Sequence, residues 1–314
     1  MAIEEYAYTV EKCDVPQVRH AMLNEYRIFR RKCLDYMRGD SATSVMNQVH
    51  DLAWHTAVFR TLNEARRLEP ARSVNGAMWE LITAGYANLM TLGIRCLVDH
   101  HADTDSLWNV IVQIEKRPEL LTREFYVCYD GLPYDIDAAR QRYIASLNLS
   151  QGPHVGWLPT SGPDAWATSE IMHSAFDKFS AGSAKRKRTD KIRPDVIEKL
   201  QTQLNHSAIK SVCTMADKRV AHAERIAEGT DAIPAVTYND IDEALAQIVR
   251  VTNYLSSHFF YDTVFGSVVP TPQFNVLEAL DEPWVTTANI PALHNYWDEI
   301  CESMDKWVRE SDEL

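Results

Sequence analysis

Glycine and cysteine are both sparse in this 314-residue chain, and each scarcity argues against a class of fold. Eleven glycines are too few for a structure rich in hairpins and tight turns, which depend on residues that tolerate positive φ. The six cysteines are scattered, with no C-x-x-C pair and no metal-type spacing, so we expect reduced thiols rather than a disulfide framework or a zinc site. They stand at positions 13, 33, 96, 128, 213 and 301.

Long apolar runs are also lacking. A membrane span needs roughly 18 uninterrupted apolar residues, and the longest candidate, residues 81–98, contains Asn88 and Arg95. The first residues, MAIEEYAYTVEKCD, place acidic side chains where a signal peptide would carry positive charge before an apolar run. We therefore expect a cytoplasmic protein with no membrane partner.

The charge is unevenly distributed. The net charge is −12, and the chain from residue 230 onward, with three basic and fifteen acidic residues, carries the whole excess. The balanced remainder contains the basic run KRKRTDKIR. Exposed charges act locally, within about 8–10 Å, so this run can attract phosphates; the alternative is a solvated linker or exposed corner. The candidate nucleic-acid-binding residues are Lys185, Arg186, Lys187 and Arg188, together with Arg225 further along.

Helical periodicity dominates what is present. Apolar residues recur at spacings of three and four, and no run alternates convincingly as a strand would. Thr237 followed by Asp240 predicts a helix cap, and the segment 75–101 is apolar nearly all round, as at the centre of a bundle. The sequence therefore predicts an all-α protein with helices over residues 15–37, 44–68, 75–101, 105–116, 136–147, 170–179, 194–227, 241–260 and 292–308.

The stretch ADKRVAHAER places a histidine among charged residues inside a predicted helix. Positions three and four apart share a helical face, so Lys218 and Arg219 flank His222 on one side and Arg225 lies on the other. Neighbouring cations favour a neutral imidazole that can take a proton, and they can also hold a phosphate. This combination suits metal-free cleavage of a phosphodiester. The alternative is a solvated face, with Asp217 paired to a cation and His222 hydrogen-bonded within the bundle.

Several stretches resemble, in order, the signature of HEPN-type proteins, and most of all their abortive-infection AbiU-like branch. DKRVAH is followed within twenty residues by TYNDIDEAL. The earlier segment 79–111 is an apolar helix that ends in Arg-x-x-x-Asp, here Arg95 and Asp99, before a short Ser-Leu helix. The resemblance implies an antiparallel four-helix bundle that usually dimerises, built here from the helices around 75–116 and 194–260.

The resulting domain organisation has three parts. Residues 1–70 would supply helices that pack on the bundle, and residues 71–265 would form the HEPN-like bundle itself with an irregular insertion at 130–193. Residues 266–314 would be an acidic C-terminal segment with a final helix.

The same resemblance implies a function. In active members an R-x4–6-H motif from each of two protomers cuts RNA without metal, and His222 matches the histidine. The matching arginine would lie at residues 215–217, which are Met, Ala and Asp, so Arg95 would have to substitute for it from the earlier helix. We expect either an RNA-cleaving effector of a bacterial defence system or an inactive module that dimerises and binds a partner protein or nucleic acid. The expected catalytic residues are His222, Arg219, Lys218 and Arg95, with Asp217 and Asp99 as structural motif residues and no cofactor.

A second polar cluster follows the apolar helix, in DHHADTD from Asp99 to Asp105. Asp99 and Asp103 are four apart and can share a helical face, but adjacent histidines point about 100° apart, so at most one can join them as a ligand. The alternative is a helix C-terminus where histidines favour the dipole and Asp103 or Asp105 caps the next helix. We predict this alternative and no metal site.

Overall fold

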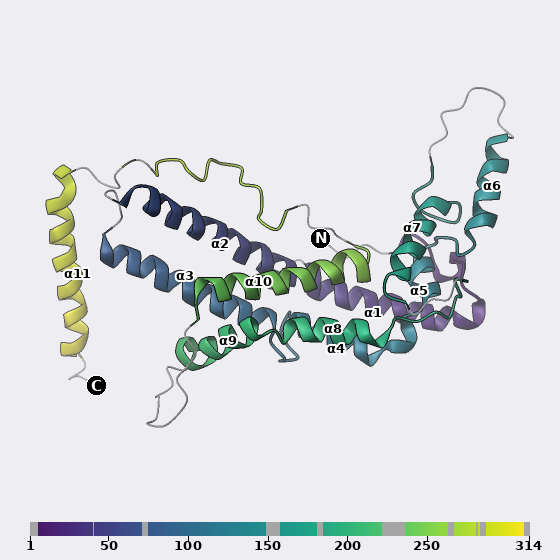
Figure 1. The fold of residues 1–314 in the computed structure, drawn as a ribbon, viewed down its shortest axis with the longest axis horizontal. Coiled ribbons are helices and arrows are strands. Elements are labelled where there is room, and N and C mark those ends of the chain that lie inside the picture. Colours follow the sequence, from purple (N-terminus) through teal and green to yellow (C-terminus); the bar gives the residue numbers. More distant parts are fainter. Residues whose placement is uncertain are drawn as a thin grey trace. The chain divides into compact units, whose positions relative to one another are not determined.

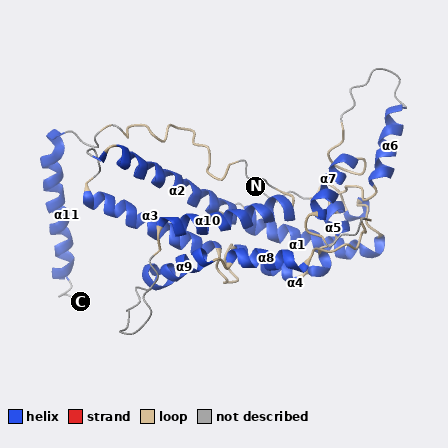
Figure 2. Cartoon of the chain, viewed as in Figure 1, coloured by secondary structure: helices blue, strands red, loops and turns tan. Residues whose placement is uncertain are grey.

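The chain is seen in a computed structural model and divides into two compact units, Met1–Pro270 and Thr271–Leu314, which are described separately. Figure 2 shows helices and loops throughout the described residues and no strand, so the all-α prediction is confirmed for them. Two isolated β-bridges, Thr122–Lys191 and Ser180–Ile192, are the β pairing present there. The structure describes residues 6–39, 41–70, 75–148, 158–180, 185–221, 236–262, 267–280, 282 and 287–310.

The first four helices are α1 (His20–Arg38), α2 (Val45–Leu68), α3 (Gly76–Leu97) and α4 (Leu107–Lys116). They match the predicted ones to within two residues at each end, except that α1 starts five residues after residue 15 and α3 ends four residues before residue 101. Side-chain caps define two of their starts: Asn75 Oδ1 accepts a hydrogen bond from Met78 N at 2.9 Å, and Ser106 Oγ accepts one from Asn109 N at 3.2 Å. Such caps satisfy backbone N–H groups that have no partner within the helix.

Of the next three helices, the first precedes the predicted irregular insertion at 130–193 and the other two lie within it. They are α5 (Arg123–Cys128), α6 (Ile136–Asn148) and α7 (Trp166–Asp177). α5 was not predicted, although all six of its residues are buried, and α7 starts four residues before its predicted beginning. α5 packs against α7, and α7 packs against α6.

The predicted single helix over residues 194–227 is wrong. The chain forms α8 (Pro194–Leu204), breaks at Asn205, and restarts as α9 (Ser207–Met215), where His206 Nδ1 accepts a hydrogen bond from Ala208 N at 3.3 Å. The His206 side chain can end one helix and cap the next because it offers the backbone an alternative partner. After α9 the backbone continues as π-helical turns over Ala216–Ala221.

The last helix of the first unit begins with the predicted cap, three residues before its predicted start at residue 241. α10 (Tyr238–Asn253) starts with a reciprocal cap: Thr237 Oγ1 accepts from Asp240 N at 3.2 Å, and Asp240 Oδ2 accepts from Thr237 N at 2.8 Å. This capping box confirms the predicted cap at Thr237 and Asp240. π-helical turns over Tyr254–Phe259 follow.

One hydrophobic core joins these helices. α10 packs against α2, α3, α8 and α9, while α1 packs against α2 and α4 (Figure 1). α3 contacts α2, α9 and α10, but the prediction that it is buried all round is wrong for the face that carries Leu81, Leu89 and Leu92, which are exposed. Beside that face, an apolar pocket of about 220 Å³ opens between α2 and α3, lined by Trp54, His55, Val58, Leu62, Ile82 and Leu89.

The N-terminal segment is held by two glycines with left-handed backbone. Gly131 and Gly162 both have φ of 82°, and a Cβ atom at either position would lie 2.5 Å or less from the Tyr8 side chain. Only glycine adopts this conformation without strain and also leaves space for the ring. Tyr8 thereby fixes the loops at residues 131 and 162 to the start of the chain.

The second unit contains α11 (Ile290–Glu310), an amphipathic helix whose apolar side chains include the exposed Leu293, Tyr296 and Trp297. Its limits lie within two residues of the predicted ones. Across the described part of the whole chain, none of the helices combines the length and apolar content needed to cross a bilayer.

Candidate functional site

The end of α3 lies beside the π-helical turns that carry the DKRVAH stretch. Arg95, in the last turn of α3, places Nη1 3.0 Å from Asp99 Oδ1, and its Nε donates to Asp217 Oδ1 at 3.0 Å. Asp99 and Asp217 come from segments far apart in the sequence, and the packing of α3 on α9 brings them together. Arg95, Asp99 and Asp217 are called the Arg95 cluster below. The structure thus joins three of the residues that the sequence analysis selects.

The Arg95 cluster is accessible to solvent. The Arg95 side chain is 33% exposed and Asp217 is half-exposed. Burial by itself would raise the pKa of Asp99, but hydrogen bonds from Arg95 and from the backbone N–H of His101 outweigh it and lower this pKa overall. The Asp99 carboxylate therefore carries charge at neutral pH.

Two thiols lie close enough to affect this cluster electrostatically. Burial raises the pKa of Cys213 to about 11, and it also raises the pKa of Cys96, with Arg95 opposing both shifts. A thiol that stays protonated at neutral pH is a poor nucleophile and a poor metal ligand. Neither cysteine therefore adds reactivity to the site.

Lys218 and Arg219 are exposed on the π-helical turns. Hydrogen bonds from residue i to i+5 place more residues in each turn than an α-helix does. The α-helical spacing that placed Lys218 and Arg219 on the face of His222 is thus replaced by wider turns over Ala216–Ala221. His222 and Arg225 lie outside the described residues, so their roles stay predictions.

The basic run is not a free linker, and that interpretation is wrong for residues 185–193. Its backbone is hydrogen-bonded to the start of α5, where Arg123 N donates to Asp190 O at 2.9 Å and Glu124 N donates to Arg188 O at 3.1 Å. The two β-bridges to Lys191 and Ile192 continue this pairing. The run is an ordered part of the first unit.

Two of its arginines already have anionic partners. Arg186 contacts Glu170 at 2.9 Å and Asp177 at 2.9 Å, both from α7 or its end. Arg188 contacts Asp14 at 2.7 Å and Glu124 at 2.7 Å. Lys185 and Lys187 are exposed beside them. The positive charge that this segment offers to nucleic acid is therefore smaller than its sequence indicates.

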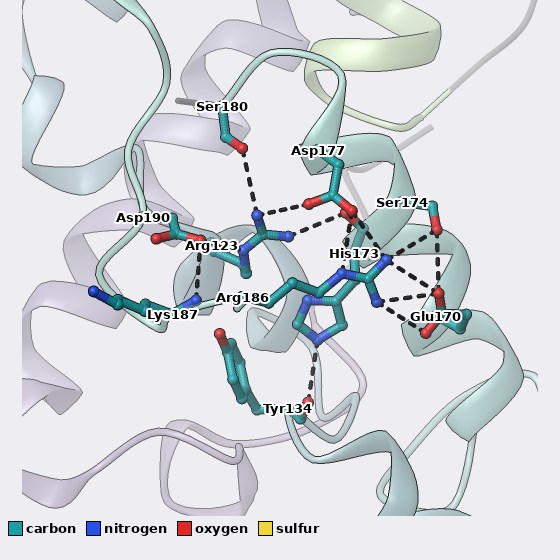
Figure 3. Close-up of polar contacts among 10 residues, drawn as sticks. All are labelled: Arg123, Tyr134, Glu170, His173, Ser174, Asp177, Ser180, Arg186, Lys187 and Asp190. Carbon is teal, nitrogen blue, oxygen red and sulfur yellow. Dashed lines mark hydrogen bonds and ion pairs between the residues drawn. The ribbon is translucent and has the colours of Figure 1, made fainter. Parts of the chain in front are cut away.

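Arg123 is the centre of this region, and the sequence analysis does not select it. Its side chain is 0% exposed, yet Nε lies 3.0 Å from Asp190 Oδ2 and Nη2 lies 2.7 Å from Asp177 Oδ1. Nη1 donates to the backbone oxygen of His173 at 3.2 Å. Figure 3 shows Arg123 and Arg186 meeting the carboxylates of α7 and of the basic run. The signal in the sequence was a charged pair, Arg-Glu, inside the apolar run LLTREFYVC.

His173 lies within the same region but has no exposed surface to offer a substrate. It is buried, its Nε2 lies 3.1 Å from Tyr134 O, and its ring meets the Tyr134 ring edge-on at 4.8 Å (Figure 3). Burial lowers the pKa of His173 to about 4, so the imidazole is neutral at physiological pH. The geometry makes it a packing residue rather than a general base.

The polar cluster after α3 has structural roles. Asp99 pairs with Arg95, the His100 ring stacks on Trp108 at 4.4 Å, and Asp105 accepts a hydrogen bond from Thr43 Oγ1 at 2.6 Å. The residue that caps α4 is Ser106, so the prediction that Asp103 or Asp105 caps it is wrong. Over the ranges described above, no three His, Cys, Asp or Glu side chains gather as a metal site would require.

No protein-family model, curated protein or solved structure matches this chain.

Proposed function

We propose that this chain is a HEPN-like, metal-independent RNA endonuclease of a bacterial defence system, in which His222 is the general acid or base and Arg95 holds the scissile phosphate. The observation that carries the proposal is the 3.0 Å contact between Arg95 and Asp217, five residues before His222 in the chain. It brings an arginine to the motif from another helix. The mutual packing of α3, α9 and α10 supports the bundle that the resemblance implies.

The proposed chemistry needs only groups of the RNA and of this chain. A neutral His222 takes the proton of a ribose 2′-hydroxyl, and that oxygen attacks the adjacent phosphorus. The bond from phosphorus to the 5′-oxygen breaks, and the leaving oxygen receives a proton, which gives a 2′,3′-cyclic phosphate and a 5′-hydroxyl. Arg95, Lys218 and Arg219 stabilise the negative charge that develops on the phosphoryl oxygens.

Arg95 has to exchange a partner in order to act in this way. Its guanidinium contacts two carboxylates. A phosphate oxygen would take the place of the Asp217 carboxylate, which is the more exposed of the two. Exposed ion pairs contribute only about 0.2–1 kcal/mol, so this exchange costs little. The Arg95–Asp99 contact can persist and keep the arginine oriented.

The test uses the purified full-length protein, single-stranded RNA and the matching DNA, with EDTA present. We expect RNA to be cut and DNA to stay intact, because DNA lacks the 2′-hydroxyl. His222→Ala should reduce the rate by about 10²–10⁴-fold, and Arg95→Ala by about 10²–10³-fold. The matched controls are His294→Ala, an exposed histidine, and Arg67→Ala, an exposed arginine paired with Glu64. RNA cleavage that survives His222→Ala eliminates the proposal.

A second candidate function is a non-catalytic module that binds a partner protein or nucleic acid. The observation that favours it is the pairing of Arg95 with two carboxylates, Asp99 and Asp217. Arg95 is then already occupied, and residues 215–217, where the motif would have its arginine, contain none. The wild-type chain would then cut no RNA with or without Mg²⁺. Binding of RNA without cleavage, weakened steeply by salt, would identify the module.

A further inference from the structure

The apolar residues of α11 follow a coiled-coil repeat. Ile290, Leu293, Trp297 and Ile300 are separated by three, four and three residues, and the sequence continues the spacing at positions 304 and 307 with Met and Trp. The average period of 3.5 is that of the seam between two supercoiled helices. Ile290 and Trp297 take the a positions of the heptad, and Leu293 and Ile300 take the d positions.

This seam is uncovered in the second unit. Ile290, Leu293 and Tyr296 are exposed, and Trp297 is 68% exposed. Soluble protein surfaces rarely keep contiguous apolar patches of this kind without a partner. A bound helix of matching pattern would remove them from water.

The charges of α11 favour a second copy of the same helix as that partner. The described acidic side chains, Asp298, Glu299 and Glu302, take positions b, c and f of the heptad, which point away from the seam. The positions that flank the seam carry His294, Tyr296 and Cys301. Two identical helices can therefore meet along the seam without bringing carboxylates face to face, although each helix is acidic.

The apolar area that the pairing of two α11 helices would bury is also sufficient for a specific interface. A buried aromatic side chain removes about 150–250 Å² from water, so Tyr296 and Trp297 of two copies contribute roughly 600 Å². That is about half of the roughly 1,200 Å² at the lower end of specific interfaces. Ile290, Leu293 and Ile300 from each copy can supply the remainder.

We infer that α11 pairs with α11 of a second copy of this chain in a two-stranded coiled coil. The pairing uses none of the residues of the Arg95 cluster, which are all in the first unit. It would hold two copies together at their acidic C-terminal segments. The helix is short, so the association is expected to depend on concentration.

The mass of the full-length protein tests this inference, measured by sedimentation from about 1 to about 100 µM. Leu293→Glu and Ile300→Glu place a charge in the seam, and each should halve the mass that the wild type reaches at high concentration. Asn295→Glu is the matched control, since it adds the same charge to the same helix at the outward f position, and it should keep the wild-type mass.

Two results would overturn the inference. One is a wild type whose mass is that of a single chain throughout the concentration range; the other is a seam variant that keeps the wild-type mass. RNA cleavage is measured on the same preparations. A wild type that stays a single chain but cuts RNA would contradict the pairing alone, and a wild type that pairs but cuts no RNA would contradict the nuclease proposal alone. Circular dichroism confirms that each variant keeps the helical content of the first unit.

Discussion

Replacing the buried Arg123 by methionine should destabilise the first unit by about 3 kcal/mol. The substitution keeps the apolar stem but removes a guanidinium that is fully buried and contacts two carboxylates. Removing one partner of a buried ion pair costs about 3–5 kcal/mol because the other charge is left without compensation. Asp190, 11% exposed, meets this condition, whereas Asp177, 42% exposed, can regain water. The expected loss is therefore at the low end of that range.

Urea unfolding of the full-length protein measures this loss, with Arg142→Met as the matched control. Arg142 also forms an ion pair, with Asp164 at 3.3 Å, but both side chains are more than half exposed. Pairs of that kind contribute about 0–1 kcal/mol. The difference between the two variants thus isolates the effect of burial on an otherwise similar contact.

The difference in free energy of unfolding between wild type and Arg123→Met should become smaller in acid. Burial alone would raise the pKa of Asp177, but Arg123 and Arg186 outweigh it and lower this pKa overall. A carboxyl whose folded pKa is lowered stabilises the fold above its unfolded pKa of about 3.9, and that contribution is lost as pH falls through the folded value. The difference in free energy of unfolding between the two proteins should therefore be largest at pH 7 and decrease below about pH 4.

Two results would refute this account of Arg123. A loss no greater than that of Arg142→Met would show that the buried contacts do not stabilise the fold. A difference that stays constant from pH 7 into the acid range would show that Asp177 does not contribute to it.

Two further predictions concern single side chains. The pKa of His173 is lowered to about 4, so the stability that its neutral form provides is complete above about pH 6.5 and is lost as pH falls towards 4, by up to about 3 kcal/mol. His173→Gln should flatten the change in urea midpoint over that pH range. A variant with the pH profile of the wild type would contradict this role of His173. In α3, Gly85→Ala should raise the thermal midpoint, since alanine favours helix by about 1 kcal/mol and its Cβ meets nothing within 4 Å. Gly93→Ala should gain less, because its Cβ would lie 2.6 Å from Leu52 Cδ2, and equal gains would show that α2 and α3 pack loosely there.

Helix boundaries could be predicted where local chemistry determines them. The reciprocal cap of Thr237 and Asp240 depends on four consecutive residues, so the sequence contains all of its information. The break at Asn205 and the short helix α5 could not be predicted in this way. The break depends on whether His206 caps a new helix, and a six-residue helix is stable only through the packing around it.

The candidate site depends on contacts between distant segments, which one sequence does not reveal. Arg95 could be proposed as a partner of the DKRVAH stretch, but its contact with Asp217 spans 122 positions. The basic run could be read only as a local excess of charge, because the carboxylates that pair with Arg186 lie on α7. The catalytic role of His222 stays a prediction.

The six-residue helix α5 has a consequence for how the chain folds. Its Arg123 contacts Asp190, 67 positions away, and its Glu124 contacts Arg19, 105 positions away. Each contact closes a long loop of the unfolded chain, and the entropy of closure is lost before the ion pair forms. We therefore expect α5 to take its place after α1, α2 and α3 have formed their local contacts.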